Sequence, residues 1–163
     1  MRFNWVDLLA IGVVSVSAGI QLLRAIRDLS LIFYETLFFI GALVGAVRFF
    51  PELHRWLNIS LPLSFLLTFI AFAMGAVVIA SILNQMVEFS LGGFGHIFGL
   101  LFGVVSGFVF GHAALRTVLL FSVNRHSVVV DAIHRSWMAS QVLYFGVFRE
   151  LLAILRIARY NNI

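Results

Sequence analysis

GHIFGLLFGVVSGFVFGHAALR occupies residues 95–116 and carries a glycine at every fourth position over most of its length. These glycines are Gly95, Gly99, Gly103, Gly107 and Gly111. Because four residues turn an α-helix by about 400°, the five positions lie almost above one another and predict a smooth groove along one helix face. Helices in lipid associate by such close approach, since no hydrophobic effect drives them together. The pattern therefore predicts a packing seam, which is either internal to the chain, between subunits, or a seam that moves.

Three more apolar runs precede this one. The four runs cover about residues 6–23, 29–50, 61–83 and 97–121. Each meets the roughly 20 residues that a helix needs to cross the hydrocarbon core of a bilayer. Hydrophobic residues make up 62% of the chain and charged residues 11%, whereas soluble domains carry about 25% charged residues. We therefore expect an all-α integral membrane protein with four transmembrane helices in residues 1–123.

Residues 124–163 differ from the runs before them, because charges recur along this tail. Its apolar residues fall at spacings of three, four or seven: Val130, Ile133, Trp137, Tyr144, Phe148, Leu151 and Leu155. This spacing predicts an amphipathic helix with a basic opposite side. Such a helix tends to lie in the membrane interface, and a fifth membrane segment or a partner-binding helix are the alternatives.

Arginine placement predicts the orientation of the chain. All 11 basic residues are arginine, and most of them fall in the segments that share one side if both termini are cytoplasmic. Since cytoplasmic loops carry an excess of basic residues, we expect both termini inside. No basic run or aromatic-basic motif is present, which argues against a nucleic-acid partner and leaves the lipid bilayer as the expected one.

No motif in the sequence indicates catalysis or ligand chemistry. The chain has no cysteine, and neither a zinc-protease helix motif nor a nucleophile elbow is present. We therefore expect no enzyme activity, no catalytic residues, no cofactor and no metal site.

Four polar residues near the start of the second run are candidates for function. They are Arg24, Arg27, Asp28 and Glu35. A carboxylate such as Glu35 inside a membrane span is costly and so suggests a functional site. Two interpretations remain open: Glu35 pairs with Arg24 or Arg27 or reaches interfacial water, or it binds a proton or a substrate.

Shorter pairs of small residues occur on the other runs. Gly41 and Gly45 form one pair on the second run. Ser15 with Gly19, and Ala71 with Gly75, form similar pairs on the first and third. They predict that these spans also pack closely against protein.

Four segments of the chain together resemble one known family. Trp5-Val6-Asp7 precedes an apolar span, and Gly19 to Asp28 forms a turn rich in Gly and Arg. Leu91, Gly99, Gly103 and Gly107 follow a leucine-and-glycine motif. Trp137, Ser140 and Val142 follow a Trp-x-x-Ser-x-Leu motif. In this order and spacing, over about residues 3–145, they resemble the colicin V production protein (CvpA) family of bacterial inner-membrane proteins.

Several positions depart from that family's pattern. Ala25 stands where glycine is usual, and Asp28 replaces glutamate. Gly95 and His96 replace an Asp-Arg pair, and Ser106 replaces a frequent arginine.

The resemblance implies a multi-pass protein of the bacterial inner membrane, needed for bacteriocin production as part of toxin biosynthesis, with a role in export, transport or the envelope. It implies no catalytic residue set. A homo-oligomeric transporter with an export-machinery or cytoplasmic partner is one interpretation. The alternative is a scaffold that transports nothing and recruits partners through its C-terminal tail.

Overall fold

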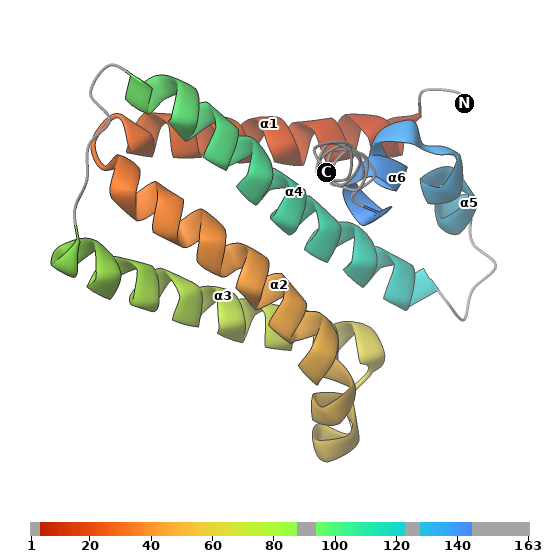
Figure 1. Ribbon diagram of the computed structural model, residues 1–163. Coiled ribbons are helices and arrows are strands. Elements are labelled where there is room, and N and C mark those ends of the chain that lie inside the picture. The colour runs from red at the N-terminus through yellow and green to blue at the C-terminus, as the bar shows by residue number, and fades with distance from the viewer. Residues whose placement is uncertain (1–3, 88–93, 123–127, 145–163) are drawn as a thin grey trace, which may run out of the picture.

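The computed structural model describes residues 4–87, 94–122 and 128–144. Four long helices come first: α1 (Trp5–Ala25), α2 (Leu29–Leu57), α3 (Leu61–Met86) and α4 (Gly95–Ser122). Two short helices follow, α5 (Val128–Arg135) and α6 (Trp137–Tyr144) (Figure 1). All regular structure in these residues is helical, and α1–α4 are long and apolar enough to cross a membrane. The prediction of an all-α membrane protein with four spans is confirmed.

Some of the predictions fall outside the described residues. These are the boundary near residue 123, the tail beyond Tyr144, the first residue of the range that resembles the family, and the match at Leu91.

Side-chain caps fix the start of the first two helices. Asn4 caps α1 in a capping box with Asp7, in which each side chain accepts a hydrogen bond from the other's backbone. The Asp28 carboxylate caps α2 by accepting from the backbone N–H of Leu31 at 2.9 Å. Such caps satisfy amides that have no partner within the helix. The turn between α1 and α2 is therefore short and fixed, and the two helices run in opposite directions.

The end of α2 lies beyond the predicted position near residue 50. The helix continues through Pro51 to Leu57 and ends at Asn58, whose φ of 49° is left-handed. Proline removes one hydrogen bond from a helix but does not force the following residues to unwind. The charged residues after Arg48 therefore mark the edge of the apolar segment and not the end of the helix.

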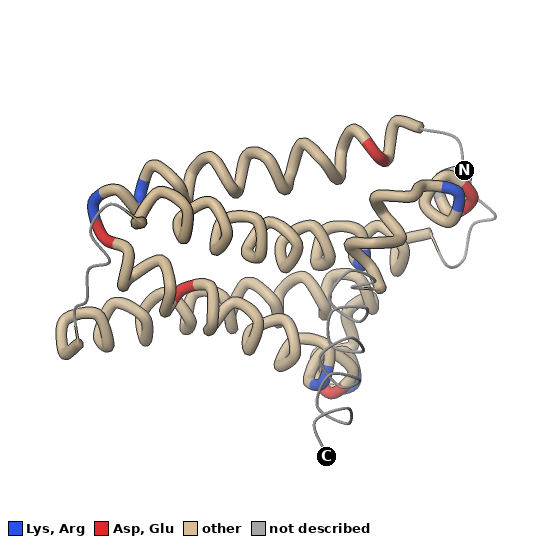
Figure 2. The backbone as a smooth tube through the Cα atoms, turned by 45° about the horizontal axis from the view of Figure 1, so that its top comes forward, with Lys and Arg blue, Asp and Glu red and all other residues tan. Residues whose placement is uncertain are grey.

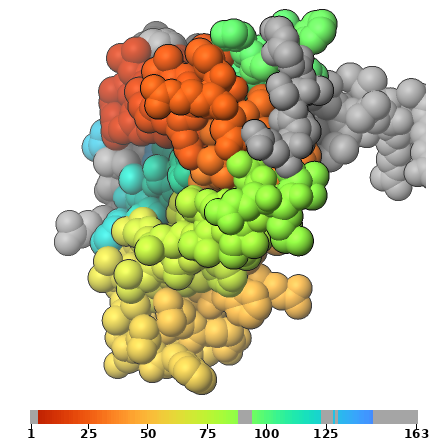
Figure 3. All heavy atoms as spheres, turned by 90° about the vertical axis from the view of Figure 1, so that its left-hand side faces the viewer, coloured from red at the N-terminus to blue at the C-terminus, as the bar shows by residue number. Residues whose placement is uncertain are grey.

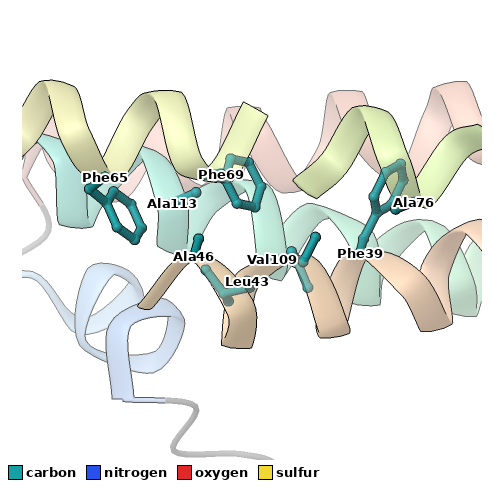
Figure 4. Close-up of a cluster of buried hydrophobic side chains, with 9 residues drawn as sticks. Phe39, Leu43, Ala46, Phe65, Phe69, Ala76, Val109 and Ala113 are labelled. Carbon is teal, nitrogen blue, oxygen red and sulfur yellow. The ribbon is translucent and has the colours of Figure 1, made fainter. Parts of the chain in front are cut away.

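One hydrophobic cluster joins α2, α3 and α4 (Figure 4). Its buried members are Phe39, Leu43, Ala46, Phe65, Phe69, Ala76, Val109 and Ala113, together with Ala42. Phe110 contacts two rings of this cluster edge-on, with centroid distances of 4.9 Å to Phe39 and 5.9 Å to Phe69. Aromatic pairs in this geometry stabilise a core beyond their buried area.

The glycine ladder of α4 packs against α1. A Cβ at Gly103 would lie 2.7 Å from the Cα of Ala18, and one at Gly107 would lie 2.8 Å from the Cα of Val14. Gly99 meets Ala25 even more closely. Only glycine fits at these three positions, so this part of the predicted seam is internal to the chain.

The two ends of the ladder have different neighbours. A Cβ at Gly111 would lie 3.1 Å from the side chain of Val142 in α6. Among the described residues, a Cβ at Gly95 would meet just one atom within 4 Å, the carbonyl oxygen of Ala25 at 3.9 Å.

The shorter pairs of small residues do not form comparable seams. A Cβ at Gly45 would make ordinary contact with the ring of Phe72 in α3 at 3.4 Å. Gly19, Gly41 and Gly75 have no atom within 4 Å of a Cβ position. Within the described residues these three glycines therefore have no close packing partner, and the prediction that their spans pack closely against protein stays a prediction.

The start of the tail folds back onto the bundle. Ile133, Ala139 and Val142 are buried against α1 and α4, whereas Trp137 and Tyr144 are 55% and 66% exposed. The predicted continuous stripe breaks at Ser136, where α5 ends and α6 begins. Within residues 128–144, the apolar side thus covers protein and does not lie only on the membrane surface.

Candidate functional site: a groove between α1 and α2

A buried ion pair joins α1 and α2 close to their connecting turn. The Arg24 guanidinium donates from Nη1 and Nη2 to the two oxygens of Glu35, both at 2.7 Å. The Glu35 side chain is 1% exposed and that of Arg24 is 44% exposed. Charges lie mainly near helix ends, with long uncharged stretches between them (Figure 2). Glu35 lies within the apolar part of α2, whereas Glu52, the other acidic residue of this helix, lies near its end. Of the two interpretations of Glu35, the structure shows the ion pair.

A second polar cluster ties this end of the bundle to α3. The Asn84 amide donates to Asp28 at 2.7 Å. The Ser30 hydroxyl lies within hydrogen-bond distance of Asp28 Oδ1, at 3.0 Å, and of the Asn84 side-chain carbonyl oxygen, and its one hydrogen can be donated to either of them. The Tyr34 hydroxyl donates to the carbonyl of Val87 at 3.1 Å. Viewed from this end, the α1–α2 turn lies directly against the end of α3 (Figure 3). Asp28 is thus a structural cap, and Arg27 is exposed with no described residue bonded to its side chain.

An open groove of about 540 Å³ runs along α1 from this end. Its lining residues come mostly from α1: Leu9, Gly12, Val13, Val16, Ser17, Ile20, Gln21 and Arg24, with Phe39 of α2 and Phe110 of α4. The volume is in the range of small-molecule sites, which are usually apolar with a few placed polar groups. Three polar side chains, Ser17, Gln21 and Arg24, lie toward the end nearest the ion pair.

The pair of rings Phe39 and Phe110 also lines a second groove, of about 440 Å³, on the α3 side. The other residues of that groove are Leu66, Phe69, Ile70, Ala73, Met74, Val77, Ala113 and Ala114. All of them are apolar. Only the α1–α2 groove of these two therefore offers hydrogen bonds to an occupant.

Three further contacts of polar residues lie between the helices of the bundle. The Thr36 and Ser106 hydroxyls are 3.0 Å apart and buried, so the position where the resembled family often has arginine forms a neutral pair here. His112 is buried with Nδ1 3.2 Å from the carbonyl oxygen of Val142. The Cζ of Arg116 lies 5.8 Å and 5.5 Å from the ring centroids of Phe50 and Phe65. Each of these contacts joins two helices: α2 and α4 for Thr36 and Ser106, α4 and α6 for His112, and α4 with α2 and α3 for Arg116.

The candidate residues from the sequence thus have separate roles. Arg24 and Glu35 meet directly, and Asp28 belongs to the neighbouring cap. Gln21 and Ser17 were not among the candidates, although their spacing from Arg24 (positions i, i+4 and i+7) places all three on one helix face. Among the described residues, no three His, Asp or Glu side chains gather as metal ligands.

Comparisons with protein-family models, with curated proteins and with solved structures find no match to this chain.

Proposed function

We propose that the chain is a bacterial inner-membrane protein of the colicin V production type, acting in export, transport or envelope function. We infer that the groove between α1 and α2 is its working site. The supporting observation is that Ser17, Gln21 and Arg24 line one end of an otherwise apolar groove on the bundle's side. Polar groups placed at membrane depth are costly, and they commonly mark the path or binding site of a substrate.

Filling the groove tests this proposal. Gly12 lines the groove and has no atom within 4 Å of a Cβ position, so Gly12→Leu occupies the groove without disturbing the fold. Gly19→Leu is the matched control, because Gly19 is equally open on the same helix but outside the groove lining.

The measurement is complementation of a gene deletion in the native bacterium, read as secreted protein and as envelope permeability to a dye. We expect Gly12→Leu to fail and Gly19→Leu to restore the wild-type phenotype at equal membrane abundance. Full complementation by Gly12→Leu would exclude the groove as the working site.

The alternative function is a scaffold that recruits a cytoplasmic or export-machinery partner through the tail. Its support is the anchoring of α5 and α6: the Ser136 hydroxyl and the Met138 amide both donate to the buried carboxylate of Asp7, at 2.6 Å and 2.8 Å. Truncation after Tyr144 removes the rest of the tail and leaves this contact in place. Loss of function with normal insertion would support the scaffold, and normal function of the truncated protein would exclude it.

Orientation and assembly are parts of the same proposal. We expect the start of α1 and the end of α4 to face the cytoplasm, since Arg48, Arg55 and Arg135 share that side. Helix α1 packs against the three central glycines of the ladder. A homo-oligomer would therefore form through another face.

A further inference from the structure

The α1–α2 groove has two chemically different halves. The half lined by Leu9, Gly12, Val13 and Val16 is apolar, and the half toward the α1–α2 turn holds Ser17, Gln21 and Arg24. Leu9 and Arg24 are 15 positions apart, which corresponds to about 22 Å along a helix. One leaflet of hydrocarbon is about 15 Å thick. The groove is therefore long enough for an acyl chain together with the polar region above it.

Gln21 lines this groove with a buried side-chain amide. The residue is 4% exposed, and its carbonyl oxygen accepts from Arg24 Nη1 at 3.4 Å. Its amide N–H₂ group has no partner among the described residues. A buried donor without a partner is costly, so an acceptor in the groove would remove that cost.

Arg24 has an unused edge on the side of the guanidinium that faces away from Gln21. Glu35 takes the end formed by Nη1 and Nη2, and the remaining Nη1 hydrogen points to Gln21. The Nε–H and the second hydrogen of Nη2 have no partner among the described residues, and the side chain is 44% exposed. Two parallel guanidinium N–H groups match the paired oxygens of a phosphate or carboxylate.

Arg27 supplies a further positive charge at the same helix end. It is exposed, and no described residue neutralises it, whereas Glu35 neutralises Arg24. Arg27 thus attracts an anionic group that is bound at Arg24. Both arginines lie at the helix end, where lipid head groups are expected.

We propose that the groove binds a bilayer phospholipid with an anionic head group. Its phosphodiester oxygens accept from Arg24 and Gln21, and one acyl chain lies along the apolar half of the groove. The inference rests on the proposed function, because it names the ligand class of the site assigned there. The bilayer supplies this amphiphile directly, since the groove lies on the flank of membrane-spanning helices.

Lipid binding to the purified full chain tests the proposal. The probes are phosphatidylglycerol and phosphatidylcholine with identical fluorescent acyl chains, titrated in detergent and followed by anisotropy. One charge-assisted hydrogen bond corresponds to about a 10- to 100-fold change in affinity. We expect phosphatidylglycerol to bind at least about tenfold more tightly, because the choline group of phosphatidylcholine would bring a positive charge close to Arg24 and Arg27. We also expect Gly12→Leu to weaken both lipids and Gly19→Leu to weaken neither.

Gln21→Leu provides a second variant that does not break the ion pair. We expect it to weaken phosphatidylglycerol and phosphatidylcholine alike, by about tenfold, because both lipids carry the phosphodiester to which the Gln21 amide donates. Equal affinity of the wild type for both lipids, or equal binding by the Gly12→Leu and Gly19→Leu proteins, would overturn the proposal.

The two proposals can fail separately. Selective lipid binding together with full complementation by Gly12→Leu would retain the lipid site and exclude it as the working site. Loss of complementation without a lipid preference would retain the working site and overturn the ligand class.

Discussion

Arg24 and Glu35 differ in how much water each can reach. The Arg24 side chain is 44% exposed, whereas Glu35 is 1% exposed and receives both of its strong hydrogen bonds from Arg24. Removing the partner of a buried charge is more costly than removing the buried charge itself. The pair is therefore energetically asymmetric, although its geometry is symmetric.

This asymmetry predicts the order of two substitutions. We expect Arg24→Leu to lower the free energy of unfolding by about 3–5 kcal/mol, because it leaves a buried carboxylate unpaired. Glu35→Leu should cost less, since the arginine can reach polar surroundings by extending its long side chain. The measurement is unfolding in detergent micelles followed by circular dichroism. The double variant should recover part of the loss of Arg24→Leu, and equal losses in the two single variants would contradict this account.

At the scale of the element, the α1–α4 seam depends on glycine at specific positions. A methyl group at Gly103 would meet the backbone of Ala18 at 2.7 Å and 2.9 Å, and backbone cannot move aside like a side-chain end. At Gly41, by contrast, an added Cβ would have no described atom within 4 Å. Both are glycines inside helices, so the intrinsic effect of adding a methyl group is the same for both.

We expect Gly103→Ala to destabilise the protein by about 1–3 kcal/mol, as overpacking does. Gly41→Ala should leave stability unchanged or raise it slightly, because alanine is the better helix former. Thermal unfolding in detergent compares the two variants directly. A loss in Gly41→Ala equal to that in Gly103→Ala would show that the seam does not depend on contact with α1.

The docking of α5 and α6 gives a second prediction for elements. Asp7 accepts from Ser136 and Met138, and Asn4 donates to the carbonyl of Ala132 at 2.8 Å, so the start of α1 holds the corner between the two short helices. In Asp7→Ala these donors lose a shared acceptor, and we expect the corner to open more often. Ile133 is 2% exposed. A cysteine at this position (Ile133→Cys) should therefore react faster with a maleimide when Asp7→Ala is also present than when Asp7 is intact.

Val128→Cys is the control for that experiment, because Val128 is 84% exposed and should react at the same rate with or without Asp7. The natural chain contains no cysteine, so no background reaction interferes. An unchanged rate at Ile133→Cys would show that Asp7 does not hold the corner.

For the whole molecule, the length of the apolar runs predicted the four spans. It did not predict which helix faces pack against one another. The runs contained enough apolar residues to cross a bilayer, and lipid leaves helix as the structure that satisfies their amides. The glycine ladder on α4 predicted a packing seam. Its partner face on α1 could not be predicted, because that face is formed by Val14, Ala18 and Ala25, whose spacing is common in any helix. The groove was not predictable either, because it depends on how α1 and α2 diverge and not on a local pattern.

The orientation of the molecule is the remaining global prediction. Consecutive spans are antiparallel, so the end of α2 and the end of α3 lie on opposite sides of the membrane. Basic residues favour the cytoplasmic side, and Arg48 and Arg55 accompany the end of α2.

Single cysteines at Trp56, 88% exposed, and Met86, 73% exposed, sample these two ends. We expect a membrane-impermeant maleimide to label Met86→Cys in spheroplasts and to label Trp56→Cys only after permeabilisation, since arginine-rich ends resist transfer across the bilayer. The opposite pattern would reverse the assigned orientation. Labelling of both from one side would contradict passage of α3 through the membrane, and with it the four-span arrangement that gives the α1–α2 groove access to lipid.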